Sequence, residues 1–238
     1  MIQPLPAPVF TPLADQNWME AWKARYQPIP IGKRLIIVPA WLESPDESRI
    51  PIRIDPGMAF GTGTHPTTQL CLEFIEEFID RGPQTVDRGS TIHRPPSTVI
   101  DIGCGSGILS IAALKLGAEF ALGVDIDEAS IRASRENARA NGVPDEKFAL
   151  GLGSVAEVLA GRYQVRQAPL VLANILAPVL VRLFDEGLAD LVAPGGTIVL
   201  SGILVEQAQT VIEAAQAHGL VSSGRKQMED WVALAVRS

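Results

Sequence analysis

From Ser97 to the end of the chain, short apolar runs that are typical of buried strands alternate with segments of helical periodicity. Such a repetition of strand, helix and strand implies an α/β fold, in which a parallel sheet carries helices on both faces. The segment 220–238 has no room for a helix between its two strand-like halves, so we expect an antiparallel hairpin at one sheet edge. The strand-like runs are STVIDIG, FALGVDID, EKFALGL, APLVLAN and GGTIVLSGI, and the helical segments are 107–117, 128–141, 153–160, 176–192 and 206–218.

The first of these strands ends in a glycine-rich loop, VIDIGCGSGILS, where ligands bind in folds of this class. Gly103, Gly105 and Gly107 alternate, but a dinucleotide fingerprint would need its third glycine where Ile108 stands. Asp101 beside the loop would repel a pyrophosphate and favour a cation. S-adenosylmethionine carries a sulfonium, an ammonium and no phosphate. The loop therefore predicts S-adenosylmethionine as the cofactor, and the simpler alternative is a tight turn without a ligand.

A second acid, Asp125, ends the next strand, in the run GVDID. Its separation from the glycine loop is close to that at which an acid reaches the hydroxyls of a ribose. Either Asp125 or Asp127 would also serve as the N-cap of the helix that begins near Glu128. We assign the cap to Asp127 and ribose binding to Asp125.

A third polar residue, Asn174, ends the run APLVLAN at the same rim of the sheet. With backbone carbonyls of the following turn, its side-chain carbonyl could accept hydrogen bonds from a target amine. The nitrogen lone pair would then point towards the methyl carbon. Methyl transfer is an in-line displacement, so positioning can supply most of the catalysis. The alternative role of Asn174 is the N-cap of the helix that starts near Leu176, and the sequence leaves both roles open.

The N-terminal third is less regular. A proline-rich opening precedes a short helix that Asp15 would cap, and strand-like runs follow at 34–41 and 50–56. The stretch DPGMAFGTGTHPTT, from Asp55 to Thr68, lacks the lysine that a phosphate-binding P-loop requires. It runs into a predicted helix at about 66–80. The segment 81–97 is rich in Gly, Pro, Ser and Arg without a period, so we expect a long mobile loop.

The composition excludes several classes of function. A formal net charge of -7 and a pI near 5.0 argue against nucleic-acid binding through bulk electrostatics. Two cysteines and three scattered histidines suggest neither a disulfide framework nor a metal site. The N-terminus lacks the features of a signal peptide, and no apolar run is long enough for a membrane span. We therefore expect a cytoplasmic protein without a metal ion and without nucleic-acid or membrane partners.

Several of these motifs occur together in one family. DPGMAFGTGTHPTTQLCL, VIDIGCGSGILSIAALKLGA, GVDID, ANILAPVL and GGTIVLSGIL resemble the bacterial methyltransferases of large-subunit ribosomal protein eleven, over roughly residues 15–238. The resemblance implies a seven-stranded class I methyltransferase domain. It also implies methyl transfer from S-adenosylmethionine to lysine side chains and the N-terminal amine of that ribosomal protein. By the same resemblance, Thr68, Gly103, Asp125 and Asn174 contact the cofactor.

The resemblance also gives the Asp55–Thr68 stretch a role, as the loop over the methyl-donor pocket. Pro66 near the first helical turn should leave N–H groups for the methionine carboxylate of the cofactor. We expect His65 to order this turn and not to act as a base. Including the residues argued above, the predicted cofactor site comprises Thr68, Asp101, Gly103, Gly105, Asp125 and Asn174.

Two departures from the family affect the expected acceptor. The family normally begins with a small domain that docks the ribosomal protein, but only about fourteen residues precede the matching linker. We therefore expect residues 1–56 to form an arm, linker helix and short strands, and residues 57–238 to form the catalytic domain. Without a docking domain, methylation of free ribosomal protein eleven should be weak. The loop at 81–97 is also longer and more arginine-rich than usual.

Other functions compete with this one. A related methyltransferase would act on another protein or on a small amine. A non-catalytic module would bind S-adenosylmethionine without turnover. A nicotinamide oxidoreductase is disfavoured by Ile108 and Asp101.

Overall fold

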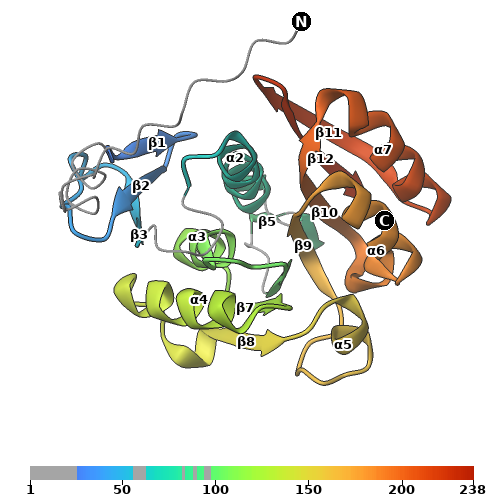
Figure 1. The fold of residues 1–238 in the computed structure, drawn as a ribbon, viewed down its shortest axis with the longest axis horizontal. Helices are drawn as coiled ribbons and strands as arrows, with labels where there is room; N and C mark the ends of the chain where they lie inside the picture. Colours follow the sequence, from blue (N-terminus) through green and yellow to red (C-terminus); the bar gives the residue numbers. More distant parts are fainter. Residues whose placement is uncertain (1–25, 56–62, 82–83, 88–89, 94–97) are drawn as a thin grey trace, which may run out of the picture.

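The computed structural model describes residues 26–55, 63–81, 84–87, 90–93 and 98–238. Its centre is a seven-stranded sheet with the order β11-β12-β10-β9-β6-β7-β8 (Figure 1). Its five strands from β10 to β8 are parallel, whereas β12 pairs antiparallel with both β10 and β11. The α/β class and the C-terminal hairpin at a sheet edge are thus confirmed. The strands are β6 (Thr98–Ile102), β7 (Phe120–Asp125), β8 (Phe148–Leu152), β9 (Ala168–Asn174), β10 (Val192–Leu204), β11 (Val221–Met228) and β12 (Trp231–Arg237).

The helices follow the predicted segments and cover both faces of this sheet (Figure 1). They are α3 (Ile108–Leu116), α4 (Glu128–Ala140), α5 (Val155–Leu159), α6 (Ala177–Asp185) and α7 (Ala208–Ala217), with short 3-10 turns η1 (Asp145–Lys147), η2 (Leu188–Leu191) and η3 (Val205–Gln207). Strand residues alternate between two apolar cores, as the two-residue period of a strand requires. On β6, Val99 packs in the core shared with α3, and Ile100 and Ile102 pack in the core shared with α6.

A three-stranded sheet comes earlier in the chain and packs on the same core as α2 and α3. It consists of β1 (Ile29–Ile31), β2 (Leu35–Pro39) and β3 (Ile50–Ile54), followed by α2 (Pro66–Arg81). The predicted strands at 34–41 and 50–56 and the predicted helix at 66–80 are confirmed, whereas β1 was not predicted. The expected division at residue 56 stays a prediction, and the expected helix after Asp15 lies outside the described residues.

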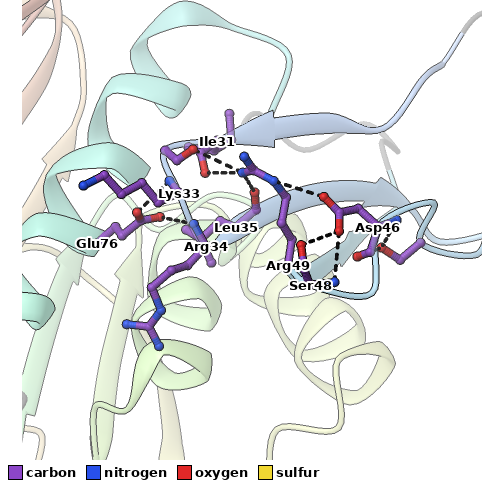
Figure 2. Close-up of polar contacts among 10 residues, drawn as sticks. Ile31, Lys33, Arg34, Leu35, Asp46, Ser48, Arg49 and Glu76 are labelled. Atoms are coloured by element: carbon purple, nitrogen blue, oxygen red, sulfur yellow. Dashed lines mark hydrogen bonds and ion pairs between the residues drawn. The ribbon is translucent and has the colours of Figure 1, made fainter.

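The turn between β1 and β2 is held on α2 by a buried carboxylate (Figure 2). Glu76 is 4% exposed and accepts hydrogen bonds from the backbone N–H of Lys33 at 2.7 Å and of Arg34 at 3.0 Å. At Gly32, whose φ is +50°, a Cβ atom would lie 2.7 Å from a carboxylate oxygen of Glu76. Arg49 donates from the other side to the carbonyls of Gly32 and its neighbours. Glu76 thereby joins the turn to α2, whose first turn borders the candidate site.

Two parts of the segment 81–97 have regular secondary structure that the sequence did not suggest. Residues Gln84–Asp87 form β4 and residues Ser90–His93 form β5, and the two strands pair antiparallel. The prediction of a loop without regular structure is therefore wrong. The β-branched residues within TVD and STIH favour extended backbone, but the surrounding Gly, Pro and Arg hide this signal. The expected mobility of the segment stays a prediction. Within the described ranges, no helix is long and apolar enough to cross a membrane.

Candidate functional site

The glycine loop is a tightly held turn at the carboxyl end of β6. Gly103 has a φ of +69° and Gly105 a φ of +55°, which favour glycine because other residues are strained there. The Gly103 N–H donates to the carbonyl of Val124 on β7 at 2.8 Å. A Cβ atom on Gly103 would lie 2.8 Å from the side chain of Ile175, which follows β9. Gly103 therefore allows the loop to lie close to both neighbouring strands.

Asp125, which ends β7, and Asp127, which follows it, have different roles in the structure. Asp127 caps α4, since its carboxylate accepts the N–H of Ala129 at 2.9 Å. The carboxylate of Asp125 accepts the N–H of Gly105 at 2.9 Å and that of Asp127 at 3.0 Å. The assignment of the cap to Asp127 is confirmed. Ribose binding by Asp125 stays a prediction, and the structure adds a role in shaping the glycine loop.

Asp101 lies beneath the glycine loop and not beside it. Asp101 lies on β6 and pairs with Leu172 of β9. The Leu172 side chain packs in the core shared with α2 and α3. The Asp101 side chain is buried, and the residue is 1% exposed. One carboxylate oxygen accepts a hydrogen bond from the hydroxyl of Ser110 at 2.7 Å. The other oxygen is buried without a partner in the part of the chain that the structure describes. The pKa of the Asp101 carboxyl is raised to about 7, mainly by burial, with a smaller contribution from the nearby charge of Asp125.

Asn174 presents a second unpartnered acceptor at the end of β9. Its amide nitrogen donates to the hydroxyl oxygen of Thr68 at 3.4 Å, and its carbonyl oxygen is buried without a partner among the described residues. Leu176, not Asn174, is the N-cap residue of α6, and no side chain caps that helix. The capping alternative for Asn174 is therefore excluded. Thr68 is fully buried, and its predicted contact with the cofactor stays a prediction.

The first turn of α2 is organised by His65, as the sequence predicted. The ring Nδ1 of His65 lies 2.8 Å from the Thr67 hydroxyl and 3.3 Å from the Thr67 backbone nitrogen. The His65 carbonyl accepts the N–H of Thr68 at 3.1 Å. The prediction that these N–H groups are free for a carboxylate is therefore wrong. The imidazole also packs edge-on against Trp231, at 4.7 Å between ring centroids, a contact that sequence reasoning missed.

These residues meet where the strand order of the sheet reverses, between β6 and β9. Open α/β sheets bind their ligands at this place. The two buried unpartnered acceptors, on Asp101 and Asn174, both call for hydrogen-bond donors, because a buried polar group without a partner is costly. A ligand with an ammonium group, together with an amine substrate, would supply these donors. A pyrophosphate would supply no donor. The two acceptors therefore fit S-adenosylmethionine and an amine.

Comparisons with known proteins agree with this reading. A sequence model of the family described as ribosomal protein L11 methyltransferase (PrmA) matches residues 6–238. The ribosomal protein L11 methyltransferase of Pseudomonas putida strain W619 is 47% identical over 205 residues, which are 86% of this chain and 63% of that protein. The protein of the same description from Marinobacter nauticus is 44% identical over 227 residues, which are 95% of this chain and 68% of that protein. The chain therefore spans about two thirds of these relatives.

A solved structure extends the similarity to three dimensions. The crystal structure of a ribosomal protein L11 methylase from Lactobacillus delbrueckii subsp. bulgaricus matches with a TM-score of 0.72 and 33% sequence identity. The match covers 89% of this chain and 98% of that one. The glycine loop, the acid that ends β7 and the amide that ends β9 thus lie on a sheet whose architecture is that of a methyltransferase.

Proposed function

Because the chain belongs to the ribosomal protein L11 methyltransferase family, we propose that it transfers methyl groups from S-adenosylmethionine to amines of that ribosomal protein. The family bears out the resemblance drawn from the motifs and, with it, the expected cofactor. Lysine side chains and the N-terminal amine are the proposed acceptors, and the cytoplasm is the proposed location. The observation that carries the proposal is the pair of buried unpartnered acceptors on adjacent parallel strands.

Three parts of the chain would hold the cofactor, which supplies an electrophilic methyl group on its sulfonium. The Asp101 carboxylate would accept an N–H of the ammonium and balance its charge in a site that water does not reach. Asp125 would accept hydrogen bonds from the ribose hydroxyls. The glycine loop would approach the ligand through its backbone, since Gly105 has no side chain and Gly103 lets the loop pack against Ile175.

Asn174 would position the acceptor amine. Thr68 accepts a hydrogen bond from the Asn174 amide nitrogen, and this bond directs the carbonyl oxygen away from Thr68. That oxygen would accept an N–H of a neutral amine and thereby aim the nitrogen lone pair. With the cofactor bound, this lone pair would face the electrophilic methyl carbon. Transfer of the methyl group would leave the thioether of S-adenosylhomocysteine, and the proton of the methylated amine would pass to solvent water. Such positioning can provide a large part of the rate enhancement.

A methylation assay tests this proposal. The purified chain is incubated with S-adenosylmethionine and ribosomal protein L11, and mass spectrometry locates the added methyl groups. We expect methylation at amines, and Asn174→Ala should lower kcat at least tenfold with a smaller change in cofactor affinity. Asn141→Ala is the matched control, because Asn141 bonds backbone groups of β3 and its own helix.

Other outcomes would identify the competing functions. Cofactor binding with methylation of another protein or a small amine, and none of ribosomal protein L11, would replace the proposed substrate. Cofactor binding without turnover on any amine would indicate a binding module. Failure to bind the cofactor would overturn the proposal.

A further inference from the structure

One face of α4 carries a row of polar side chains that point into the protein. Ser134, Asn137 and Asn141 are spaced three and four residues apart, so they lie on the same side of the helix. Ser134 is fully buried and Asn137 is 3% exposed. Buried polar groups are costly unless they are hydrogen-bonded. All three side chains have partners, and each of them bonds at least one backbone group of another segment.

Two members of this row hold the glycine loop. The Ser134 hydroxyl donates to the carbonyl of Gly105 at 2.9 Å, and the amide nitrogen of Asn137 donates to the carbonyl of Ser106 at 2.9 Å. In a trans peptide the carbonyl and the next N–H point in opposite directions. Holding the Gly105 and Ser106 carbonyls towards α4 therefore turns the following N–H groups away from α4. Asp125 holds the loop from β7, through the Gly105 N–H.

Asn137 also bonds a second segment beside the site. Its carbonyl oxygen accepts the backbone N–H of Asp55 at 3.2 Å, at the end of β3. The Asp55–Thr68 stretch begins at this residue. One amide group thus joins the glycine loop to the start of that stretch. Asn141, one helical turn further, bonds the N–H of Arg53 at 2.8 Å and its carbonyl at 2.6 Å, with no bond to the glycine loop.

We propose that Asn137 is a positioning residue for cofactor binding: its amide sets the spacing between the glycine loop and the end of β3. This inference rests on the proposed function, since it takes the glycine loop as the cofactor site. The two bonds act on backbone groups that no side-chain substitution in the loop itself would remove. The loop is therefore preorganised from α4 before the cofactor arrives, which lowers the cost of ordering it on binding.

Calorimetric titration with S-adenosylhomocysteine tests the role of Asn137. For Asn137→Ala we expect the Kd to rise about tenfold, with kcat at saturating cofactor within about twofold of wild type, because Asn137 does not touch the acceptor amine. Asn141→Ala should lower the Tm to a similar degree and leave the Kd within about twofold. Asn137→Asp keeps an acceptor for the Asp55 N–H and loses the donor to Ser106. It should match the Kd of Asn137→Ala.

The inference is overturned if Asn137→Ala lowers the Tm as Asn141→Ala does and leaves the Kd unchanged. If Asn137→Ala does not fold, Asn137→Asp decides by the same criterion, since it keeps the volume and one of the two bonds. The wild-type titration separates the two proposals. No binding by the wild type refutes the proposed function, whereas wild-type binding that neither variant weakens refutes only the role of Asn137.

Discussion

The surroundings of the Asp101 carboxyl disfavour its ionised form. Its pKa is about 7 in the folded protein against an ordinary value of 3.8, because burial disfavours the carboxylate. Between these pH values the folded chain holds a proton that the unfolded chain has released. Rising pH therefore lowers the free energy of unfolding through this group.

Asp101→Asn removes this pH dependence and keeps an acceptor for the Ser110 hydroxyl. Relative to wild type, the free energy of unfolding of the variant should rise by roughly 2–4 kcal/mol between pH 4 and pH 8. Urea denaturation at both pH values measures the change. Asp80→Asn is the control, because Asp80 is an exposed partner of Arg34 and should show no such gain. A variant that loses stability relative to wild type as the pH rises would contradict the assignment.

Asp125 is predicted to bind the ribose of the cofactor. In the structure its carboxylate accepts a hydrogen bond from the Gly105 N–H. Asp125→Ala should weaken cofactor binding by roughly 1–3 kcal/mol, because the partners of the carboxylate are left without an acceptor. Calorimetry gives the change in Kd. Asp127→Asn is the matched control two residues away, since asparagine also caps helices well and should leave the Kd unaltered. An unchanged Kd for Asp125→Ala would reduce Asp125 to a structural residue of the loop.

At the scale of elements, Glu76 joins the N-terminal sheet to α2 through two backbone hydrogen bonds. Glu76→Ala leaves both N–H groups of the turn without their acceptor. We expect the free energy of unfolding to fall by roughly 1–3 kcal/mol, measured by urea denaturation. Asp80→Ala, on the same helix but in an exposed ion pair with Arg34, should cost less than about 1 kcal/mol. Equal losses in the two variants would contradict the role given to Glu76.

The elements that the sequence predicted well have a strong period. The helix at 66–80 followed from apolar spacing, and the strands from β6 to β10 followed from short apolar runs between helical segments. β1 was missed because the three residues of IPI are too few to show a pattern. The pairing of β4 and β5 was hidden by the composition around them.

The site was predictable at the ends of strands and less so within them. The motifs indicated Gly103, Asp125 and Asn174 because each follows an apolar run. The burial of Asp101 depends on which face of β6 meets α2 and α3, and sequence spacing does not reveal that. The contacts of Thr68 with Asn174 and of Asn137 with Asp55 join segments far apart in the chain. Such long-range contacts leave no local pattern in the sequence.

At the scale of the whole molecule, the topology of the sheet brings the residues of the site together. The chain leaves β6 towards β7 and β8 on one side and returns to β9 and β10 on the other. The glycine loop, Asp125 and Asn174 therefore meet at one end of the sheet, although about seventy positions separate the first from the last. We propose that the Asp101 carboxylate beneath this place binds the ammonium of the cofactor.

The most direct test compares two ligands on two proteins by calorimetry. S-adenosylhomocysteine carries the ammonium, whereas 5′-methylthioadenosine has the same nucleoside and lacks the amino-acid part. Asp101→Asn should weaken S-adenosylhomocysteine at least tenfold, which is about 1.4 kcal/mol, and leave 5′-methylthioadenosine within about twofold. Equal weakening of both ligands, or no weakening of either, would contradict the claim.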